Sequence, residues 1–397
     1  MMHQVKLTAN IYYLGFNDRR THLFENIWPI PYGVAYNSYL IDDSKVALID
    51  TVDRQFIEDY LDAIEEILEG RPVDYLILNH VEPDHSGALR AVTARFPNIT
   101  LVGNKKTFPL VENMYFKPVN VREVADGDTL TIGATTLSFH TVPMVHWPET
   151  MVTYDRTHEI LFSGDAFGSF GTLDGGVFDD QLNLSFFEEE AMRYFTNIVG
   201  KYCPHTQRAL AKLKDLSIKI IAATHGPLWR DNLEWILSRY RKWSAYQAEV
   251  GAVIVYGSMY GNTQKMAEAI ARQLAIRGIK NIRIYDVSKT HKSYIISDIF
   301  KYKAFIAGSC AYNNELFPNM ESLLTHIAHT GIKERYLSIF GNYAWSGGGV
   351  KNLRKFAAET GWELVGEPVE EQCSLKPAQF EACIRLADAV ADKLGAA

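Results

Sequence analysis

Two patterns of apolar and polar residues follow one another along the chain. In the first part, up to about residue 245, residues 54–69 carry apolar side chains at helical spacing and end at Gly70, which predicts a helix. Short apolar segments in the same part predict strands, and several of them end in a histidine or an aspartate. These strands are expected at residues 36–41, 46–50, 75–78, 98–102, 129–133, 135–141, 150–154, 159–163 and 218–223.

In the second part, strands and helices alternate. The alternation predicts a parallel sheet with helices on both faces, that is, an α/β fold. A boundary near residue 249 therefore gives two domains, residues 1–249 and residues 250–397, as the length of the chain also favours. The expected strands are 252–256, 281–286, 303–308 and 335–340, and the expected helices are 263–277, 292–301, 319–330 and 348–360.

Composition excludes several classes of protein. Hydrophobic residues make up 47% and charged residues 22% of the chain, as in ordinary globular proteins. No apolar run approaches the ~20 residues that cross a bilayer, and a net charge of −7 disfavours nucleic acid as a partner. The four cysteines form no CxxC pair, so we expect reduced thiols in a cytoplasmic protein.

A cluster of potential metal ligands follows the strand at 75–78. His80, Glu82, Asp84 and His85 lie within six residues, in a sequence that favours a turn. Two imidazoles and two carboxylates suit iron, manganese or zinc, but not copper(I). The alternative is a solvated polar turn that happens to contain two histidines.

Three further segments repeat the arrangement and favour the metal hypothesis. His146, Asp165 and His225 each come after an apolar strand. Each also lies close to a glycine or a proline, as expected for ligand loops at the end of a sheet.

A second site is expected where the strand 252–256 meets the following helix. The segment Ser258–Thr263 has the flavodoxin pattern, in which backbone N–H groups and a helix N-terminus surround a phosphate. The pattern differs from the glycine motifs of NAD and ATP sites. Flavodoxin-like sheets bind FMN where the loops after the first, third and fourth strands meet, although a domain that has lost its flavin is the alternative. The residues expected to bind FMN are Ser258, Met259, Tyr260, Gly261, Asn262, Thr263, Ala311, Tyr312, Asn313, Asn342, Tyr343, Ala344, Trp345, Ser346, Gly347 and Gly348.

Taken together, these motifs resemble those of the flavodiiron proteins, also called A-type flavoproteins, over essentially the whole chain. The resemblance implies a metallo-β-lactamase-like αββα sandwich followed by a flavodoxin-like doubly wound parallel sheet. Zinc members of the metallo-β-lactamase superfamily usually have a histidine where this chain has Glu82, and the carboxylate favours iron. The implied ligands are His80, Glu82 and His146 for one iron, Asp84, His85 and His225 for the other, and Asp165 as the bridge.

The resemblance also suggests which residues contact the substrate. His22 lies in a segment, Arg19–Glu25, that is similar to one lining the diatomic pocket of the family, and Tyr194 resembles the family's pocket tyrosine. Each can donate a hydrogen bond to bound dioxygen or nitric oxide, and a purely structural role is the alternative for both. Trp147, beside His146, is expected to shield the metal site from water.

The implied function is an oxidoreductase that reduces dioxygen to water, nitric oxide to nitrous oxide, or both, with electrons delivered through FMN. Without CxxC pairs, the donor is expected to be separate, either a rubredoxin-like protein or a reduced cofactor. A short linker between the domains favours a head-to-tail homodimer, or a tetramer, in which the FMN of one subunit serves the irons of another. The alternatives are a metallohydrolase with a regulatory flavodoxin domain, and an electron carrier with an inactive metal domain.

Overall fold

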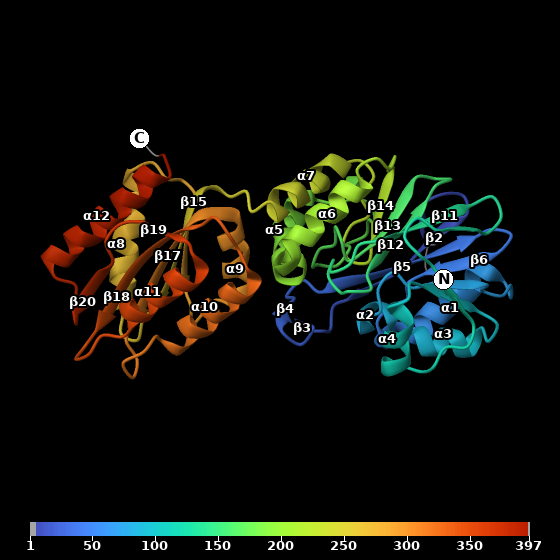
Figure 1. Cartoon of the computed structure of the whole chain (residues 1–397), viewed down its shortest axis with the longest axis horizontal. Helices are drawn as coiled ribbons and strands as arrows, with labels where there is room; N and C mark the ends of the chain where they lie inside the picture. The colour runs from blue at the N-terminus through green and yellow to red at the C-terminus, as the bar shows by residue number, and fades with distance from the viewer. Residues whose placement is uncertain (1–4, 396–397) are drawn as a thin grey trace. The chain divides into compact units, whose positions relative to one another are not determined.

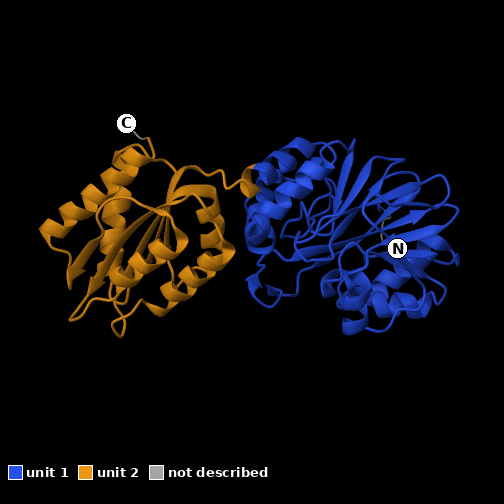
Figure 2. Ribbon diagram, in the orientation of Figure 1, with its two compact units in different colours: residues 1–241 blue, residues 242–397 orange. Residues whose placement is uncertain are grey.

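The protein, described here over residues 5–395 of a computed structural model, folds into two compact units (Figure 1). Figure 2 shows them as residues 1–241 and 242–397, divided within helix α7 (Leu233–Ser244). The sequence places the domain boundary slightly later, at 249/250, and that position stays a prediction. Among the described residues, no helix is long and apolar enough to cross a membrane.

The first unit contains two β-sheets that pack face to face. The larger has the order β1-β2-β5-β6-β7-β8-β9, with strands β1 (Val5–Lys6), β2 (Ile11–Asp18), β5 (Val34–Asp42), β6 (Val46–Ile49), β7 (Tyr75–Ile77), β8 (Thr100–Gly103) and β9 (Val121–Glu123). The smaller runs in chain order, with strands β10 (Thr129–Thr131), β11 (Thr136–Thr141), β12 (Met151–Asp155), β13 (Ile160–Gly164) and β14 (Ile220–Ala223). Strands β3 (Leu23–Phe24) and β4 (Trp28–Pro29) form a separate hairpin.

Helices flank this pair of sheets on both sides. In Figure 1, α1, α3 and α4 gather beside the larger sheet, and α5, α6 and α7 lie near β13 and β14 of the smaller. Besides α7, the helices are α1 (Ile57–Leu68), α2 (Pro83–Ser86), α3 (Leu89–Arg95), α4 (Thr107–Met114), α5 (Leu184–Tyr194) and α6 (Cys203–Leu213). The arrangement confirms the expected αββα sandwich.

The packing of α1 shows why its sequence forms a helix. Tyr60, Ile64 and Leu68 recur every fourth residue and are all buried. The helix ends at Glu69, which has a left-handed backbone, and Gly70 follows. Between the two sheets, a hydrophobic core fills the sandwich with side chains from both, so the chain brings the ends of distant strands together.

The second unit is a parallel sheet covered by helices. Its order β16-β15-β17-β18-β19, with β20 also paired to β18, places the first strand between the second and the third, which is the flavodoxin-like order. The strands are β15 (Glu249–Gly257), β16 (Ile282–Asp286), β17 (Tyr302–Cys310), β18 (Tyr336–Tyr343), β19 (Glu363–Leu364) and β20 (Val369–Gln372). The helices are α8 (Asn262–Ile276), α9 (Lys292–Lys301), α10 (Pro318–Thr330), α11 (Gly349–Thr360) and α12 (Pro377–Lys393).

All strand pairs in this sheet are parallel, which confirms the doubly wound architecture. Side chains of β15, β17, α8 and α12 form a core that is separate from that of the first unit. The loops that follow β15, β17 and β18 therefore meet at one edge of the sheet, because these three strands are adjacent and run in the same direction.

Candidate functional site

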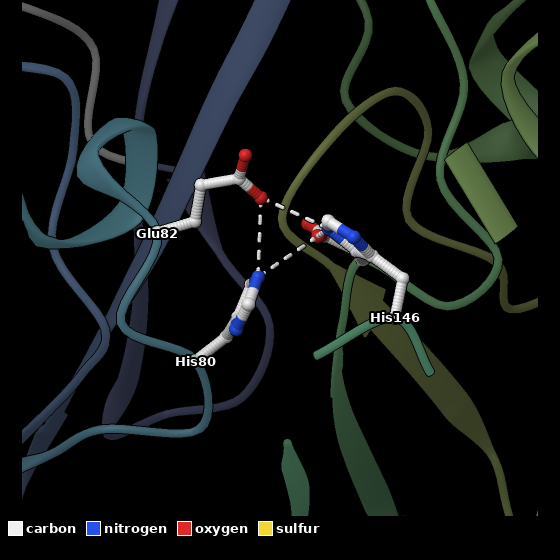
Figure 3. A group of neighbouring side chains, drawn as sticks. His80, Glu82 and His146 are labelled. Atoms are coloured by element: carbon white, nitrogen blue, oxygen red, sulfur yellow. Dashed lines mark hydrogen bonds and ion pairs between the residues drawn. The ribbon is translucent and has the colours of Figure 1, made fainter. Parts of the chain in front are cut away.

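Four side chains from three loops of the first unit converge on one buried point. They are His80 after β7, Glu82 at the start of α2, His146 between β11 and β12, and Asp165 after β13. Glu82 Oε2 lies 3.2 Å from His80 Nε2 and 2.9 Å from His146 Nε2. Asp165 Oδ2 also lies 2.9 Å from His146 Nε2. Figure 3 shows His80, Glu82 and His146 directed toward this point from opposite sides.

A second group adjoins the first and shares its aspartate. His225 Nε2 lies 3.2 Å from Asp84 Oδ2, and His85 Nε2 lies 3.3 Å from Asp84 Oδ1. The other oxygen of Asp165, Oδ1, lies 2.7 Å from His85 Nε2 and 3.5 Å from His225 Nε2. One carboxylate thus faces both groups, one oxygen to each.

Unsatisfied polar atoms test whether this cluster fits metal ions. Both carboxylate oxygens of Asp84 and both ring nitrogens of His85 are buried without a well-directed hydrogen bond. Apart from His85 Nδ1, these atoms have only the ion-pair contacts within the cluster described above. Buried polar atoms are normally paired, and those left unpaired need an explanation such as a bound ion. Imidazole and carboxylate donors around two adjacent points match the ligand preference of iron, so the residues present fit a dinuclear iron centre.

Opposite charges dominate the electrostatics of the cluster. Burial alone raises the pKa of Asp165, but the neighbouring His85, His146 and His80 outweigh it and hold that pKa well below its usual range. Burial lowers the pKa of His85 and of His146, yet the facing carboxylates raise each to about 9. Because a cation competes with these imidazole protons, metal binding at this cluster releases protons.

Backbone hydrogen bonds hold the ligand loops in place. Asp50, at the end of β6, accepts hydrogen bonds from the N–H groups of Asn79 (2.7 Å) and His80 (3.3 Å). The carbonyl of Asn79 in turn accepts from the N–H of Met151 at the start of β12, at 3.0 Å. The loop that carries His80 is therefore fastened to both sheets.

Aromatic rings enclose the second group of ligands. The rings of Phe24, Tyr36 and Tyr194 lie 5.3, 5.6 and 5.5 Å from that of His225. Tyr194 ends α5 and is completely buried, and its hydroxyl has no hydrogen-bond partner. The structure therefore brings Tyr194 to the cluster, and its role in contacting substrate stays a prediction.

For His22, the role in contacting substrate likewise stays a prediction. Its side chain is exposed, and it is not among the residues that line the cavity of about 680 Å³ opening beside Glu82 and Asp84. Four other residues of the same segment do line this cavity, namely Thr21, Leu23, Phe24 and Glu25. Partial desolvation of its carboxyl group, followed by the negative charge of Glu82, raises the pKa of Glu25 to about 7, although the residue as a whole is exposed. Glu25, which the sequence did not single out, thus lines the cavity beside Glu82.

A phosphate-sized cradle lies at the N-terminus of α8, in the second unit. Gly261 has a φ of +85°, and its N–H donates to the Ser258 hydroxyl at 3.0 Å. The side chain of Thr263 is buried, and its hydroxyl has no hydrogen-bond partner. The first turn of a helix of 15 residues adds free N–H groups. This arrangement fits the phosphate of a mononucleotide.

The other loops expected to bind flavin lie beside this cradle, at the ends of β17 and β18. Several of their aromatic side chains are exposed: Tyr312 by 43%, Trp345 by 82% and, from the cradle itself, Tyr260 by 90%. Large exposed rings are unusual on a surface that binds nothing and suit the stacking of a planar ring system.

The side chain of Asn342 makes hydrogen bonds within the protein, and its expected contact with flavin stays a prediction. Its side-chain amide donates to the carbonyl oxygens of Glu371 (3.0 Å) and Cys373 (2.5 Å). The amide therefore ties the end of β18 to the end of β20 and the residue that follows it. The remaining expected residues, Met259, Asn262, Ala311, Asn313, Tyr343, Ala344, Ser346, Gly347 and Gly348, lie in these same three loops.

Sequence reasoning missed two buried acids that support the ligands. Glu149 lies within 2.7 Å of the ring of His80, and Asp50 holds the backbone of the same residue. Both acids lie in the same kind of place as the ligands, since Asp50 directly follows a strand and Glu149 stands three residues after His146. Their position in the sequence does not, however, show that they contact His80.

Comparison with known families agrees with the geometry. Residues 34–226 match the family described as ODP family beta lactamase, and residues 254–386 match the flavodoxin family. The two matches fall within the first and second units, respectively.

Relatives span both units. The anaerobic nitric oxide reductase flavorubredoxin of Vibrio vulnificus is 32% identical over 368 residues, which cover 90% of this chain and 74% of that protein. The structure resembles rubredoxin oxygen:oxidoreductase from Desulfovibrio gigas, with a TM-score of 0.95, 28% identity and 99% of each chain covered. It also resembles the flavodiiron protein of Giardia intestinalis, with a TM-score of 0.92, 25% identity and the same coverage. The chain therefore belongs to the flavodiiron protein family.

Proposed function

We propose that this chain reduces dioxygen, nitric oxide or both at a dinuclear non-heme iron centre, with electrons arriving through FMN from an external donor. The observation that carries the proposal is the pair of ligand groups joined by the two oxygens of Asp165. The names of the relatives point the same way, since one is a nitric oxide reductase and another is an oxygen oxidoreductase.

The ligand assignment follows from the two groups. The lone pairs of ring nitrogens and carboxylate oxygens converge on one point in each group, so each group would hold one iron. We assign His80, Glu82 and His146 to one iron, Asp84, His85 and His225 to the other, and Asp165 to both.

When bound, the irons and FMN would supply the electrons that reduce dioxygen to water or nitric oxide to nitrous oxide. The residues around them keep the site dry and orient a small ligand. The rings of Phe24 and Tyr36 cover His225 and exclude water on that side, and the ring of Trp147 packs edge-on against His80, with 5.0 Å between centroids. The buried hydroxyl of Tyr194 is available to donate a hydrogen bond to a diatomic molecule.

The cavity leading to the ligands favours neutral molecules. Apart from Glu82 and Asp84, whose charges bound irons would offset, its charged lining residues are Glu25, Asp53 and Arg54. Leu23, Phe24, Ile27 and Tyr36 add apolar surface. This lining supports an uncharged diatomic gas as substrate.

A metallohydrolase is the main rival, because its fold and ligand loops are the same. Glu82 in place of a histidine and the complete flavin cradle both argue against it. The electron donor is proposed to be separate from these 397 residues, which contain no CxxC pair. We also propose a cytoplasmic homodimer or tetramer in which FMN and irons of different subunits work together.

The first prediction tests the reaction itself. Protein purified without oxygen should contain two irons and one FMN per chain, and it should consume nitric oxide, dioxygen or both when supplied with one reduced artificial donor. Electrode measurements of each gas under the same conditions give the preference. Zinc in place of iron, with hydrolysis of a thioester or lactam and no gas consumption, would establish the metallohydrolase instead.

The second prediction concerns the iron ligands. Replacing Glu82 with alanine removes a carboxylate that faces two histidines, so iron content and both activities should fall sharply while FMN remains bound. Iron analysis and the flavin absorbance measure the two cofactors separately. Glu66→Ala, on the exposed side of α1, is the matched control and should change neither. Normal iron content in the Glu82 variant would show that this residue is not a ligand.

The third prediction concerns the flavin cradle. Thr263→Ala removes the buried hydroxyl and should weaken FMN binding roughly 10-fold to 100-fold, the loss expected for a hydrogen bond to a charged group. Gly261→Val should weaken it further, because a β-branched residue is strained at a φ of +85°. Fluorescence titration of the flavin-free protein measures both, with Thr325→Ala on α10 as the control. Unchanged affinity in both variants would place the cradle elsewhere.

The fourth prediction tests cooperation between subunits. A chain with an incomplete iron centre, such as Glu82→Ala, and a chain lacking FMN, such as Gly261→Val, are each expected to be inactive. After exchange of subunits, the mixture should regain activity, because mixed dimers contain one complete pair of cofactors. Exchange is verified with two affinity tags. Persistent inactivity in verified mixed dimers would mean that electrons pass within one chain.

A further inference from the structure

Glu149 contacts His80, one of the proposed metal ligands, at the ring nitrogen that faces away from the metal position. It lies in the loop between β11 and β12, and only 1% of its surface is exposed. Its Oε1 atom lies 2.7 Å from His80 Nδ1 and accepts a second hydrogen bond, at 3.1 Å, from the N–H of Val81. The opposite ring nitrogen of His80, Nε2, faces Glu82 and Asp165 at 3.2 and 3.6 Å.

We infer that Glu149 is a positioning residue that fixes the tautomer of His80 and makes the two metal positions unequal in affinity. A carboxylate at Nδ1 keeps the proton there, which leaves the lone pair of Nε2 directed at the metal. The negative charge also makes the imidazole a stronger donor. The inference rests on the proposed function, in which His80 is an iron ligand.

The expected difference in metal affinity between the two positions follows from the surroundings of their histidines. Each group has two imidazoles and one carboxylate of its own, and both share Asp165. In the second group, however, His225 Nδ1 is paired with the neutral carbonyl of Ala35 at 2.8 Å, and His85 Nδ1 has no hydrogen-bond partner. Among these three described histidines, His80 is the one whose Nδ1 contacts a carboxylate. Buried Asp50 lies near enough to His85 to interact with it electrostatically but makes no hydrogen bond to its ring. We therefore expect the position of His80, Glu82 and His146 to bind its metal more tightly.

The loop around Glu149 is rigid enough for this role. The Asn104 side chain donates a hydrogen bond to the backbone carbonyl of Glu149 at 2.5 Å. The hydroxyl of Thr150 donates one to the backbone carbonyl of Trp147 at 3.0 Å. The second carboxylate oxygen of Glu149, Oε2, is buried without a hydrogen-bond partner. An unpaired buried oxygen lowers stability, so a role limited to joining two loops does not explain why a charged residue stands here.

A matched pair elsewhere in the same sandwich separates a metal effect from a folding effect. Asp155, which is buried, lies 2.6 Å from the Nδ1 atom of His158, away from the metal cluster. Asp155→Asn therefore removes the same kind of charge from the same kind of contact without touching a ligand. Glu149→Gln removes the charge and keeps an acceptor for His80, whereas Glu149→Ala removes both.

The experiment measures metal release from the full-length protein. Wild type and the Glu149 and Asp155 variants are loaded with Fe²⁺ or Co²⁺ to two ions per chain, and Glu82→Ala to the one ion that its intact second group would hold. Extraction by a chromophoric chelator is then followed without oxygen. We expect two phases, with the slow phase missing in Glu82→Ala and thereby assigned to the His80 position. Glu149→Gln should accelerate that phase roughly 10-fold to 100-fold and change the other by less than about twofold. Glu149→Ala should have a larger effect, Glu149→Asp a smaller one, and Asp155→Asn none.

Three outcomes overturn the inference. One is unchanged release in Glu149→Gln, and another is equal acceleration of both phases. The third is failure of both Glu149→Gln and Glu149→Ala to fold, judged by circular dichroism, while Asp155→Asn folds normally, because Glu149 would then be structural. A wild-type chain that never holds two ions contradicts the proposed function itself. If only the inference about Glu149 is wrong, the wild-type chain still binds two metal ions and still consumes gas.

Discussion

The structure of the first unit depends on the burial of many ionisable side chains within a few ångströms of one another. Carboxylates and imidazoles alternate around Asp165, so that each negative group faces a group able to carry positive charge. Burial of a lone charge is very costly, and a pair is tolerated only when geometry and hydrogen bonds are good. The requirement explains why the ligand loops follow directly after strands. It also explains why hydrogen bonds to the Asp50 carboxylate and from the Met151 N–H hold the loop of His80 in place.

Much of this architecture could be predicted from local sequence. The alternation of strands and helices in the second half predicted a parallel sheet, and the strand ends carrying His80, Asp165 and His225 proved to be neighbours. Such predictions succeed because strand periodicity and turn residues act over a few positions. Helices α2 to α7 and α12 were not predicted, since in them the polar and apolar faces depend on what packs against each helix.

Contacts between distant loops escaped prediction for a different reason. Glu149 and His80 are 69 residues apart, and their pairing depends on how β11, β12 and β7 lie against one another. His22 is the reverse case. Its segment is similar to one that lines the diatomic pocket of the family, but in this chain Glu25 lines the cavity and the exposed His22 does not. Sequence thus located the loops, whereas the packing of the sheets selects which atoms meet.

The two separate hydrophobic cores have a consequence for how the protein responds to heat. The core between the two sheets of the first unit shares no residue with the core of the second, so each can melt by its own cooperative transition. Bound ligands stabilise only the unit that holds them. Calorimetry should therefore resolve two transitions, one moved by metal and the other by flavin. A single melting temperature does not describe this chain.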